Sequence, residues 1–316
     1  MAERIVTHAE IERVLPGIDV VAAMERAFAT YAAGRAVVPP VGELLFADPP
    51  GDAHIKYGYV EGDEVFVIKV ATGFYDNPKW GLPPNSGLML VFDARTGLPQ
   101  AVLLDQGHLT NIRTAAAGAV AAKYLAPKAI STIAVLGGGL QARLQAVHLM
   151  AVTACRRIAL WARRREAAEA CAADLTAAGF TVTVVDSPAA AAAEAELIVT
   201  ATAATAPLLQ AADIRSGTHI TAMGSDTETK QELSTAILGK ADLVVADSIA
   251  QCRVCGEISR ALAAGAVDQA ALVELGDVVA GKAPGRTSDD QITVADLTGV
   301  AVQDIEIAKA VLAGLE

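Results

Sequence analysis

Ser131–Gln145, STIAVLGGGLQARLQ, decides the fold of this chain. The apolar run Ile133–Leu136 predicts a short β-strand, followed by three glycines and then by a segment with helical periodicity. Gly137, Gly139 and Ala142 match the G-x-G-x-x-G/A fingerprint of dinucleotide-binding folds. Three glycines after an apolar run also occur in ordinary loops. Because strand, turn and helix follow one another here in the required order, we predict a dinucleotide site.

The chemistry of this turn suits a pyrophosphate. Gly137 permits the tight turn, Gly139 lets backbone N–H groups approach the phosphates, and the small Ala142 lets the helix pack closely on the strand. The helix N-terminus adds unpaired N–H groups and a partial positive charge. The turn, with Leu140 and Gln141 at the start of the helix, is therefore the expected cofactor cradle.

The remainder of the second half predicts a Rossmann domain, in which helices connect the strands of a parallel sheet. Thr200–Thr202 ends one expected strand at the carboxyl edge of the sheet, where cofactor contacts are expected. A later strand leads into Gly224–Asp226, and the alanine run 189–195 predicts a helix. The expected strands after the glycine turn are Arg157–Trp161, Thr181–Val185, Glu196–Ala201, Thr218–Met223 and Leu243–Ala246.

Arginines follow the second of these strands, in Ala162–Arg165. NAD-binding proteins usually place an acidic residue there for the ribose hydroxyls, and the first acid, Glu166, comes one position too late. Arg163 and Arg164 suit the 2′-phosphate of NADP. Alternatively, they solvate the start of a helix or stack on adenine while NADH binds. We favour NADPH over NADH.

The first half predicts a separate α+β domain. Residues 8–34 have the periodicity of a pair of amphipathic helices, and short strands follow at hairpin spacing. Antiparallel strands before a nucleotide-binding fold imply a second domain rather than an extension of the Rossmann sheet. A surface segment is expected at 268–285, and a helix at 295–316 that returns to the first domain. The expected strands are Gly42–Phe46, His54–Tyr59, Val65–Val70, Ser86–Phe92 and Gln100–Asp105.

Four cationic or polar side chains of this half are candidate site residues. Lys69 lies inside an apolar strand, where it either reaches solvent from an edge or is buried and needs a partner. Lys56 poses the same question and shares one strand face with His54 by strict alternation. Arg113 precedes a helix of small apolar residues. It forms either a structural ion pair or the clamp for a substrate carboxylate.

Composition excludes several classes of protein. The 316 residues suggest about two domains, and 53% of them are apolar but only 4% aromatic. A net charge of −11 without a basic stripe argues against nucleic-acid binding. No apolar run reaches the ~18 residues of a membrane span, and the N-terminus lacks the apolar core of a signal peptide. We therefore expect a soluble, cytoplasmic protein without membrane contact.

The four cysteines, Cys155, Cys171, Cys252 and Cys255, are typical of free thiols in a reducing compartment. Cys252 and Cys255 have C-x-x-C spacing. There is no second such pair and no nearby histidine, so we expect neither a metal site nor a redox centre.

The order of these motifs resembles the ornithine cyclodeaminase/μ-crystallin family over essentially the whole chain. The matching segments are Lys69, Leu-Asp-x-Gly-x-Leu-Thr-x-x-Arg113-Thr-Ala-Ala, Leu-Gly-x-Gly-x-Gln-Ala142, Gly224-Ser-Asp226-x-x-x-Lys230-x-Glu-Leu and Gly299-Val-Ala-Val-Gln-Asp304. The combination is far more specific than the glycine motif alone.

The resemblance implies a homodimer of two-domain subunits that performs hydride chemistry at the α-carbon of amino acids. By position, Lys69 matches the family's active-site lysine and Arg113 its carboxylate-binding arginine. Asp226 matches the catalytic carboxylate and Lys230 the lysine beside the nicotinamide. The implied domains are 1–125 with 296–316 for substrate binding and dimerisation, and 126–295 for NAD(P).

One departure from the family bears on the substrate. Many members carry another carboxylate-binding arginine soon after an early proline, where this chain has Pro39-Pro-Val-Gly-Glu. Lys56 and His54 offer alternative groups on the neighbouring strand. The segments around them look most like iminosuccinate reductases and ectoine-utilisation cyclodeaminase-like proteins.

The expected activity is NAD(P)H-dependent reduction of a 2-imino acid, with iminosuccinate to aspartate as the best candidate. Arg113 would hold the α-carboxylate, Lys69 would add charge or relay a proton, and a partly buried Asp226 would act as general acid/base. A cyclodeaminase, a cyclic ketimine reductase and a non-catalytic ligand-binding protein remain alternatives. The expected cofactor-binding residues are Thr114, Gly137, Gly139, Leu140, Gln141, Ala142, Arg163, Arg164, Thr200, Ala201, Thr202, Gly224, Ser225 and Lys230.

Overall fold

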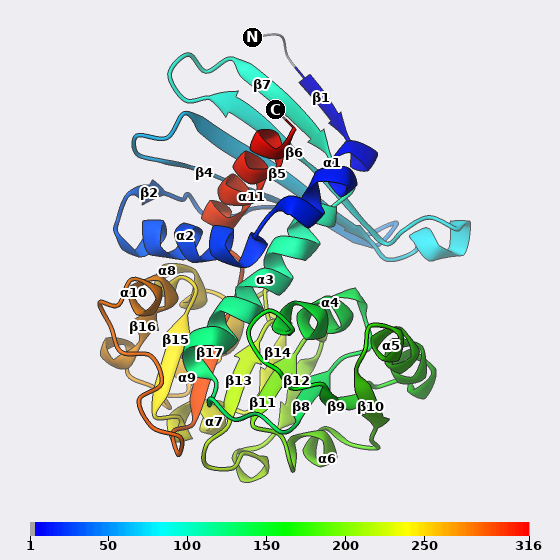
Figure 1. Cartoon of the computed structure of the whole chain (residues 1–316), viewed down its shortest axis with the longest axis vertical. Coiled ribbons are helices and arrows are strands. Elements are labelled where there is room, and N and C mark those ends of the chain that lie inside the picture. The colour runs from blue at the N-terminus through cyan, green and yellow to red at the C-terminus, as the bar shows by residue number, and fades with distance from the viewer. Residues whose placement is uncertain (1–3, 316) are drawn as a thin grey trace. The chain divides into compact units, whose positions relative to one another are not determined.

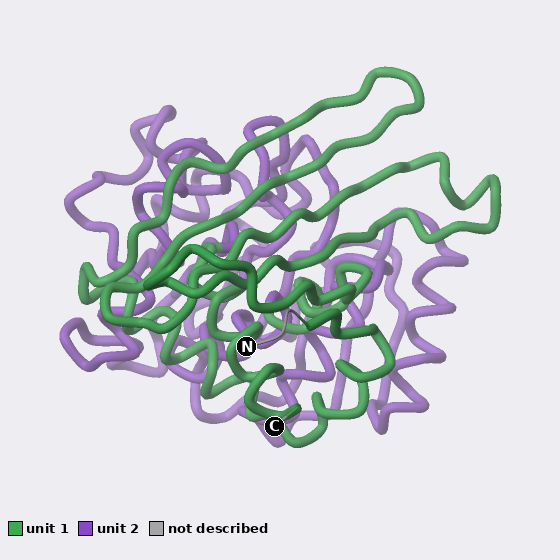
Figure 2. The backbone as a smooth tube through the Cα atoms, turned by 90° about the horizontal axis from the view of Figure 1, so that it is seen from above, with its two compact units in different colours: residues 1–113, 300–316 green, residues 114–299 purple. Residues whose placement is uncertain are grey.

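The computed structural model describes residues 4–315, which form two compact units (Figure 2). Unit 1 contains residues 1–113 and 300–316, and unit 2 contains residues 114–299. The expected boundary after residue 125 lies at the end of helix α3 (His108–Leu125), whereas the structure divides this helix after Arg113. The chain returns to unit 1 after Gly299, because strand β17 (Thr293–Asp296) belongs to the sheet of unit 2.

Unit 1 is built on one sheet with the strand order β1-β7-β6-β5-β4-β2, and β3 pairs with β4 (Figure 1). Neighbouring strands are antiparallel except for the parallel pair of β1 and β7. Helices α2 and α11 pack against each other, and α11 also packs on β4 and β5. The strands are β1 (Arg4–Thr7), β2 (Ala36–Val37), β3 (Gly42–Phe46), β4 (Gly51–Val60), β5 (Val65–Phe74), β6 (Asn85–Asp93) and β7 (Pro99–Leu104); the helices are α1 (His8–Val14), η1 (Leu15–Gly17), α2 (Val20–Ala32), η2 (Asn77–Trp80) and α11 (Ala301–Gly314).

Period-two alternation divides the residues of this sheet between its faces. In β5, Val65, Val67 and Lys69 are buried on the face that the helices cover, while Phe66 and Ile68 are half-buried on the other. Lys69 therefore occupies a position where the strand otherwise presents apolar core residues.

Unit 2 is a Rossmann domain, and the predicted α/β class is confirmed. Its eight-stranded sheet has the order β10-β9-β8-β11-β13-β17-β15-β16, and all its recorded strand pairs are parallel. The order reverses between β8 and β11, which is where such sheets bind dinucleotides. The remaining strands are β8 (Ile133–Leu136), β9 (Arg157–Trp161), β10 (Thr181–Val184), β11 (Leu197–Thr200), β13 (His219–Ala222), β15 (Leu243–Ala246), β16 (Val273–Glu274) and a separate pair, β12 (Thr205–Leu209) with β14 (Gln231–Leu233).

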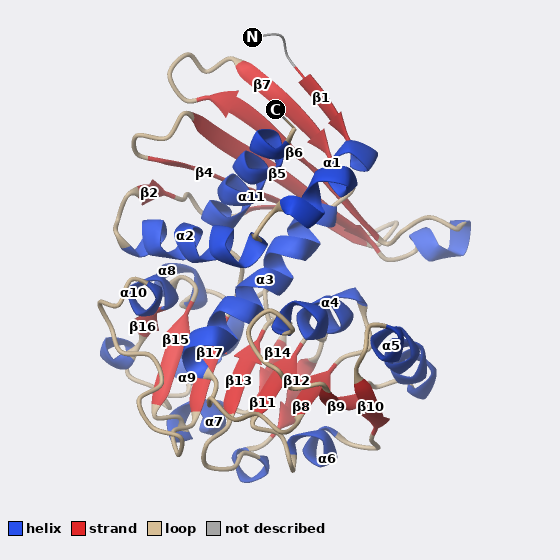
Figure 3. Cartoon of the chain, viewed as in Figure 1, coloured by secondary structure: helices blue, strands red, loops and turns tan. Residues whose placement is uncertain are grey.

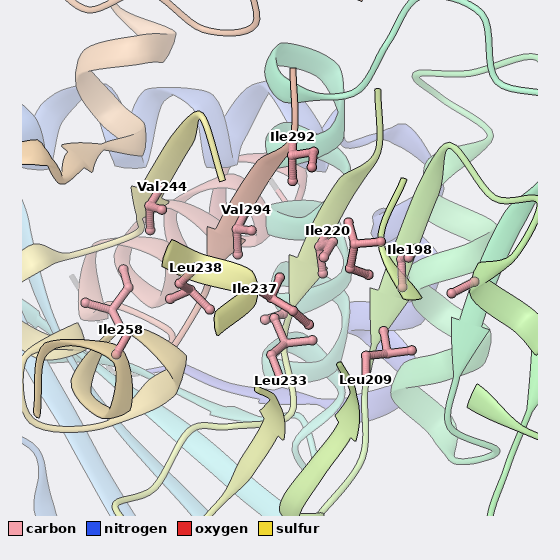
Figure 4. Packing of buried hydrophobic residues seen from close by; sticks show 14 of the residues in the cluster. Ile198, Leu209, Ile220, Leu233, Ile237, Leu238, Val244, Ile258, Ile292 and Val294 are labelled. Atoms are coloured by element: carbon pink, nitrogen blue, oxygen red, sulfur yellow. The ribbon is translucent and has the colours of Figure 1, made fainter. Parts of the chain in front are cut away.

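Helices cover both faces of this sheet (Figure 3). Along β8, Ala134 and Leu136 belong to one apolar cluster, whereas Ile133 and Val135 belong to another. Figure 4 shows the first cluster, in which strand residues such as Ile198 and Ile220 lie near helix residues such as Ile237. The helices are α4 (Leu140–Leu149), α5 (Arg165–Ala177), α6 (Pro188–Ala192), η3 (Ala211–Asp213), α7 (Thr235–Lys240), α8 (Ile249–Cys252), α9 (Gly256–Ala263), η4 (Gln269–Ala271) and α10 (Leu275–Val279).

One sequence expectation near the C-terminal end is wrong, and another is only partly met. The returning helix was expected from residue 295, but Thr293–Asp296 is a fully buried strand between β13 and β15, and the helix begins at Ala301. The expected surface segment 268–285 contains α10, whose Leu275 and Val278 are buried. Within residues 4–315, no helix combines the length and apolarity needed to cross a bilayer.

Candidate active site

A buried cluster of charges in unit 1 joins Lys69 of β5, Arg113 of α3 and Asp304 of α11. Arg113 Nε donates to Asp304 Oδ1 at 2.9 Å, and Lys69 Nζ lies 3.6 Å from Asp304 Oδ2. The three residues are only 2%, 3% and 1% exposed. The sequence left two alternatives for Lys69: an edge lysine that reaches solvent, or a buried lysine with a partner. The structure shows the second.

The charges in this cluster influence one another because little water separates them. Burial is the largest cause that lowers the pKa of Lys69, to about 7. The Asp304 carboxylate opposes that shift, and the charges of Arg113 and Lys56 add to it. For Asp304, burial acts to raise the pKa, but the neighbouring cations outweigh it and the net shift is downward. Asp304 is therefore ionised at neutral pH, while Lys69 exists in both protonation states.

Lys56 lies directly opposite Lys69 in the antiparallel pairing of β4 and β5. Opposed residues point to the same face of a sheet, so Lys56 shares the helix-covered face with Lys69. It is half-buried, and its charge contributes to the lowered pKa values of Lys69 and Asp304. The geometry thus brings Lys56 to the cluster.

His54 precedes Lys56 by two residues on β4 and is held by acidic neighbours. Its Nε2 lies 3.4 Å from Asp52 Oδ1, and its Nδ1 lies 3.8 Å from Glu43 Oε1. Tyr75 donates a hydrogen bond to the other carboxylate oxygen of Asp52, Oδ2. These carboxylates would offset the charge of a protonated His54, so this residue contributes less positive field than the sequence suggested.

The glycine turn of unit 2 has the geometry that the fingerprint requires. Gly137 has φ of 137°, and a Cβ at this residue would lie 2.5 Å from the Ala201 carbonyl oxygen. Ala142 is fully buried, as close packing of helix and strand demands. Gly139 is the N-cap of α4, where no side chain caps the helix, and a Cβ there would meet nothing within 4 Å. The cradle is therefore open above the helix N-terminus, where Leu140 is half-exposed.

The arginines after β9 have different surroundings. Arg165 pairs with Glu169 at 2.9 Å and with Asp186 at 3.1 Å. Arg163 and Arg164 are exposed, and neither has a recorded ion pair with any of residues 4–315. Two guanidinium groups at the end of the second Rossmann strand are thus available to a ligand.

A buried carboxylate that the sequence analysis did not single out organises the carboxyl ends of β11 and β13. Glu232 accepts hydrogen bonds from Thr200 Oγ1, Thr202 N and Thr202 Oγ1, each at 2.7 Å, and from Gly224 N at 2.8 Å. The hydroxyls of both threonines, which were expected to contact the cofactor, are thus occupied within the protein. The sequence feature that could have identified Glu232 is its place in Lys230-x-Glu-Leu, one of the segments that resemble the family.

Asp226 follows this junction and lies at the surface of unit 2. About 51% of its side chain is exposed, and its Oδ1 pairs with Lys230 Nζ at 2.5 Å. Ser225 is buried, with its hydroxyl bonded to the Lys230 carbonyl. A partly buried Asp226 was expected from the sequence, whereas about half of its side chain is exposed. Thr114 is half-buried, and its carbonyl accepts a hydrogen bond from Gln145 Nε2 at 3.1 Å.

The C-x-x-C cysteines lie just before α9, whose Glu257 accepts a hydrogen bond from Glu232 N. Cys252 is buried, Cys255 is half-buried, and neither forms a disulfide bond within residues 4–315. Among residues 4–315, no three His, Cys, Asp or Glu side chains are grouped so that they could hold a metal ion.

Known proteins are similar to this chain over nearly its whole length. A profile of the ornithine cyclodeaminase/mu-crystallin family matches residues 1–315. A protein of Sinorhizobium fredii named as an uncharacterised cyclodeaminase is 44% identical over 96% of this chain and 93% of its own.

Two solved structures share the fold. An archaeal alanine dehydrogenase, a dimer with bound NAD, has a TM-score of 0.89 and 34% identity, covering 98% of this chain and 95% of that one. The iminosuccinate reductase of Paracoccus denitrificans in complex with NAD+ has a TM-score of 0.87 and 33% identity, with the same coverage of 98% and 95%.

Proposed function

Because this chain belongs to the ornithine cyclodeaminase/mu-crystallin family, we propose that it is an NAD(P)H-dependent oxidoreductase acting at the α-carbon of a 2-imino or 2-amino acid. The solved relatives named above are a dehydrogenase and a reductase, which supports this chemistry. The best substrate candidate is iminosuccinate, reduced to aspartate. The observation that carries the proposal is the buried cluster of Lys69, Arg113 and Asp304 with Lys56 opposite Lys69.

The open glycine turn fits a dinucleotide. The backbone N–H groups at the start of α4 would hold the pyrophosphate, because no side chain caps them and Gly139 leaves room above them. When bound, a reduced nicotinamide supplies the hydride for a C=N bond. Arg163 and Arg164 support NADPH as the preferred form, whereas the solved relatives contain NAD. A direct comparison of the two affinities decides between them.

Three side chains have proposed roles toward the substrate. Arg113 binds the α-carboxylate through its planar fork, which fixes the α-carbon for reaction. Lys69 adds positive charge and exchanges a proton, as its pKa of about 7 allows. Asp226 gives a proton to the imine nitrogen in reduction and takes it back in oxidation.

The balance of charge in unit 1 supports a dicarboxylate. Lys56, Lys69 and Arg113 bring up to three positive charges, and Asp304 brings one negative charge. A second substrate carboxylate would gain from this field, whereas the ammonium of a diamine such as ornithine would be repelled. The alternative function is a cyclodeaminase, which the similarity to the Sinorhizobium protein favours.

The test is a steady-state comparison of NADH and NADPH consumption with four substrates: oxaloacetate plus ammonia, pyruvate plus ammonia, a cyclic ketimine and ornithine. The proposal expects the fastest turnover with oxaloacetate plus ammonia. Conversion of ornithine without net consumption of the nicotinamide would instead establish a cyclodeaminase. Faster turnover of pyruvate or the cyclic ketimine would remove the dicarboxylate assignment but not the reductase.

Lys56→Met is expected to damage the dicarboxylate reaction selectively, by about tenfold or more in kcat/KM, because one charge-assisted contact is lost. Lys79→Met is the control, since Lys79 is exposed and pairs only with Asp76 among the recorded ion pairs. An equal loss of kcat/KM for monocarboxylate and dicarboxylate imines would show that Lys56 does not bind the second carboxylate.

We further propose a homodimer formed through the open face of the unit 1 sheet. Ile5, Val102, Leu90, Ile68 and Tyr57 are register partners and form one apolar row across five strands. Ile5 is 65% exposed and Tyr57 is 38% exposed. Large exposed apolar patches mark interaction surfaces, and the archaeal relative is a dimer. A second copy of this chain is the proposed partner.

We place the protein in the cytoplasm. Cys155, Cys171, Cys252 and Cys255 form no disulfide bonds within residues 4–315, which suits a reducing compartment.

A further inference from the structure

The first turn of α11 places a carboxylate between two cations. Asp304 Oδ1 accepts the hydrogen bond from Arg113 Nε, while Oδ2 is buried without a hydrogen-bond partner and faces Lys69 Nζ at 3.6 Å. A position in the first helical turn is favourable for a negative charge, because the helix N-terminus carries a partial positive charge. The fold therefore stabilises an anion at this point, among groups proposed to bind the substrate.

Gln303 fixes a second edge of the same guanidinium. Its Oε1 accepts from Arg113 Nη1 at 3.3 Å and from Val300 N at 2.8 Å. Because the second bond closes the cap of α11, the amide is held in place by the helix that presents it. With Nε and Nη1 occupied, the Nη2 edge has no recorded partner among residues 4–315.

We propose that Asp304 is a positioning residue of this active site, which turns the Nη2 edge of Arg113 to the substrate carboxylate and holds a proton on Lys69. This inference rests on the proposed function, because it assumes that Lys69 and Arg113 bind an imino acid. It adds a role for a residue that touches the two substrate-binding cations rather than the substrate.

The effect on Lys69 follows from the charges around its ammonium. Asp304 faces it from α11, Arg113 from α3 and Lys56 from β4, and the buried Asp105 lies close enough to Asp304 for the two charges to interact. Of these influences on Lys69, Asp304 favours the protonated form, while burial and the two cations oppose it. Without the carboxylate, Lys69 would lose its proton at a lower pH. Arg113 would lose the acceptor that sets its orientation.

Asp304→Asn tests both effects, because it removes the charge and keeps the shape. The limb of the pH profile of kcat/KM that lies near pH 7 should move to lower pH by about one unit or more, the scale of a lost charge at this distance. KM for the imino acid should rise by about tenfold or more as the guanidinium loses its orientation. The matched control is Glu306→Gln on the same helix, whose carboxylate pairs with Arg26 and Lys309. An unmoved limb in Asp304→Asn would overturn the proposal, as would an equal shift in the control.

A readout without turnover separates this inference from the proposed function. The Lys69 signal in the NMR spectrum of the full chain with 13Cε-labelled lysine, identified by its loss in Lys69→Met, can be titrated directly. It should titrate lower in Asp304→Asn than in the wild type. Asp304→Glu, which restores the charge, should return it toward the wild-type value. If the protein reduces no imine but the Lys69 signal still titrates lower in Asp304→Asn than in the wild type and in Asp304→Glu, the proposed function is refuted. The effect of Asp304 on the protonation of Lys69 then still stands. Loss of the native fold in both variants would show a purely structural residue and overturn the proposal.

Discussion

Asp226 and Lys69 have contrasting surroundings, although both are proposed to exchange protons. Lys69 is 2% exposed, and its proton affinity is set by burial and by charged neighbours. Asp226 has half its side chain exposed and pairs with Lys230. Fixed charges around the buried Lys69 set how strongly it holds its proton and attracts an anionic substrate. The exposed carboxylate of Asp226 can exchange protons with water. This difference fits the proposed roles, in which Lys69 adds charge and exchanges a proton inside the buried cluster and Asp226 gives the proton to the imine nitrogen.

Asp226→Asn should lower turnover by ~10²-fold or more, the scale of a lost general acid/base, and leave cofactor affinity nearly intact. Steady-state kinetics with a parallel measurement of NAD(P)H binding checks both parts. Glu228→Gln is the matched control, because Glu228 is an exposed acid two residues away. Near-normal turnover of Asp226→Asn would remove this residue from the mechanism.

The pair Arg163→Ala and Arg164→Ala, made together, should weaken NADPH binding more than NADH binding, because a phosphate loses charge-assisted hydrogen bonds. Fluorescence titration of both nucleotides measures the difference. Arg165→Ala should lack this selectivity, since Arg165 is already paired with Glu169 and Asp186. If the wild type prefers NADH and the double variant changes neither affinity, the 2′-phosphate assignment is refuted.

At the scale of elements, two glycines at strand ends have opposite surroundings. Gly139 lies between β8 and α4, where a Cβ would meet nothing within 4 Å. Gly224 follows β13, where a Cβ would collide with the Thr202 carbonyl oxygen and would lie 2.6 Å from Glu232 Oε1. Gly139 leaves space for a ligand. Gly224 leaves space for the hydrogen bonds that Glu232 accepts from the protein itself.

Gly139→Ala should therefore cost less than about 1 kcal/mol of stability but weaken the dinucleotide by about tenfold or more. Gly224→Ala should destabilise the fold by ~1–3 kcal/mol, as overpacking does. Thermal unfolding without cofactor and nucleotide titration distinguish the two variants. Unchanged nucleotide binding in Gly139→Ala would mean that the pyrophosphate lies elsewhere.

The sequence allowed prediction of elements with a local signal. Gly42–Phe46, Ile133–Leu136 and Arg157–Trp161 were expected as strands and have those bounds, because turn-forming or charged residues follow each apolar run within two positions. Thr293–Asp296 was missed, since it is short and, unlike Ile133–Leu136, begins and ends with polar residues. Its register partners in β13 and β15 are distant in the chain, and pairing with them makes the segment a strand.

The same limit applies to the site. Lys69 was recognisable because a lysine in an apolar strand violates the usual pattern. Asp304 and Glu232 were quoted only as parts of family segments, since a single acid at the start of a helix or strand is unremarkable in sequence. What distinguishes them is the partners they meet: Arg113 is 191 residues before Asp304, and Thr200 is 32 residues before Glu232. Such pairings depend on the folded topology.

The open sheet face of unit 1 gives a prediction for the whole molecule. Tyr57→Glu should weaken dimerisation by about a hundredfold, because it would bury an unpaired charge in the proposed interface. Sedimentation over a range of concentrations measures this. Val254→Glu is the control, since Val254 is a 61% exposed apolar residue of unit 2. A wild-type monomer, or a Tyr57→Glu dimer as stable as the wild type, would exclude this face.

The position of α11 in the chain also sets an order of events during synthesis. Residues 114–299 of unit 2 are continuous, whereas unit 1 needs Val300 onward to complete its sheet packing and to supply Asp304. Domains generally fold as units while the ribosome delivers them. Unit 2, which binds the nucleotide, can therefore fold before α11 of unit 1 has been synthesised. A nascent chain could then hold a nicotinamide before it can hold a substrate, so reductive chemistry would begin only after translation has passed α11.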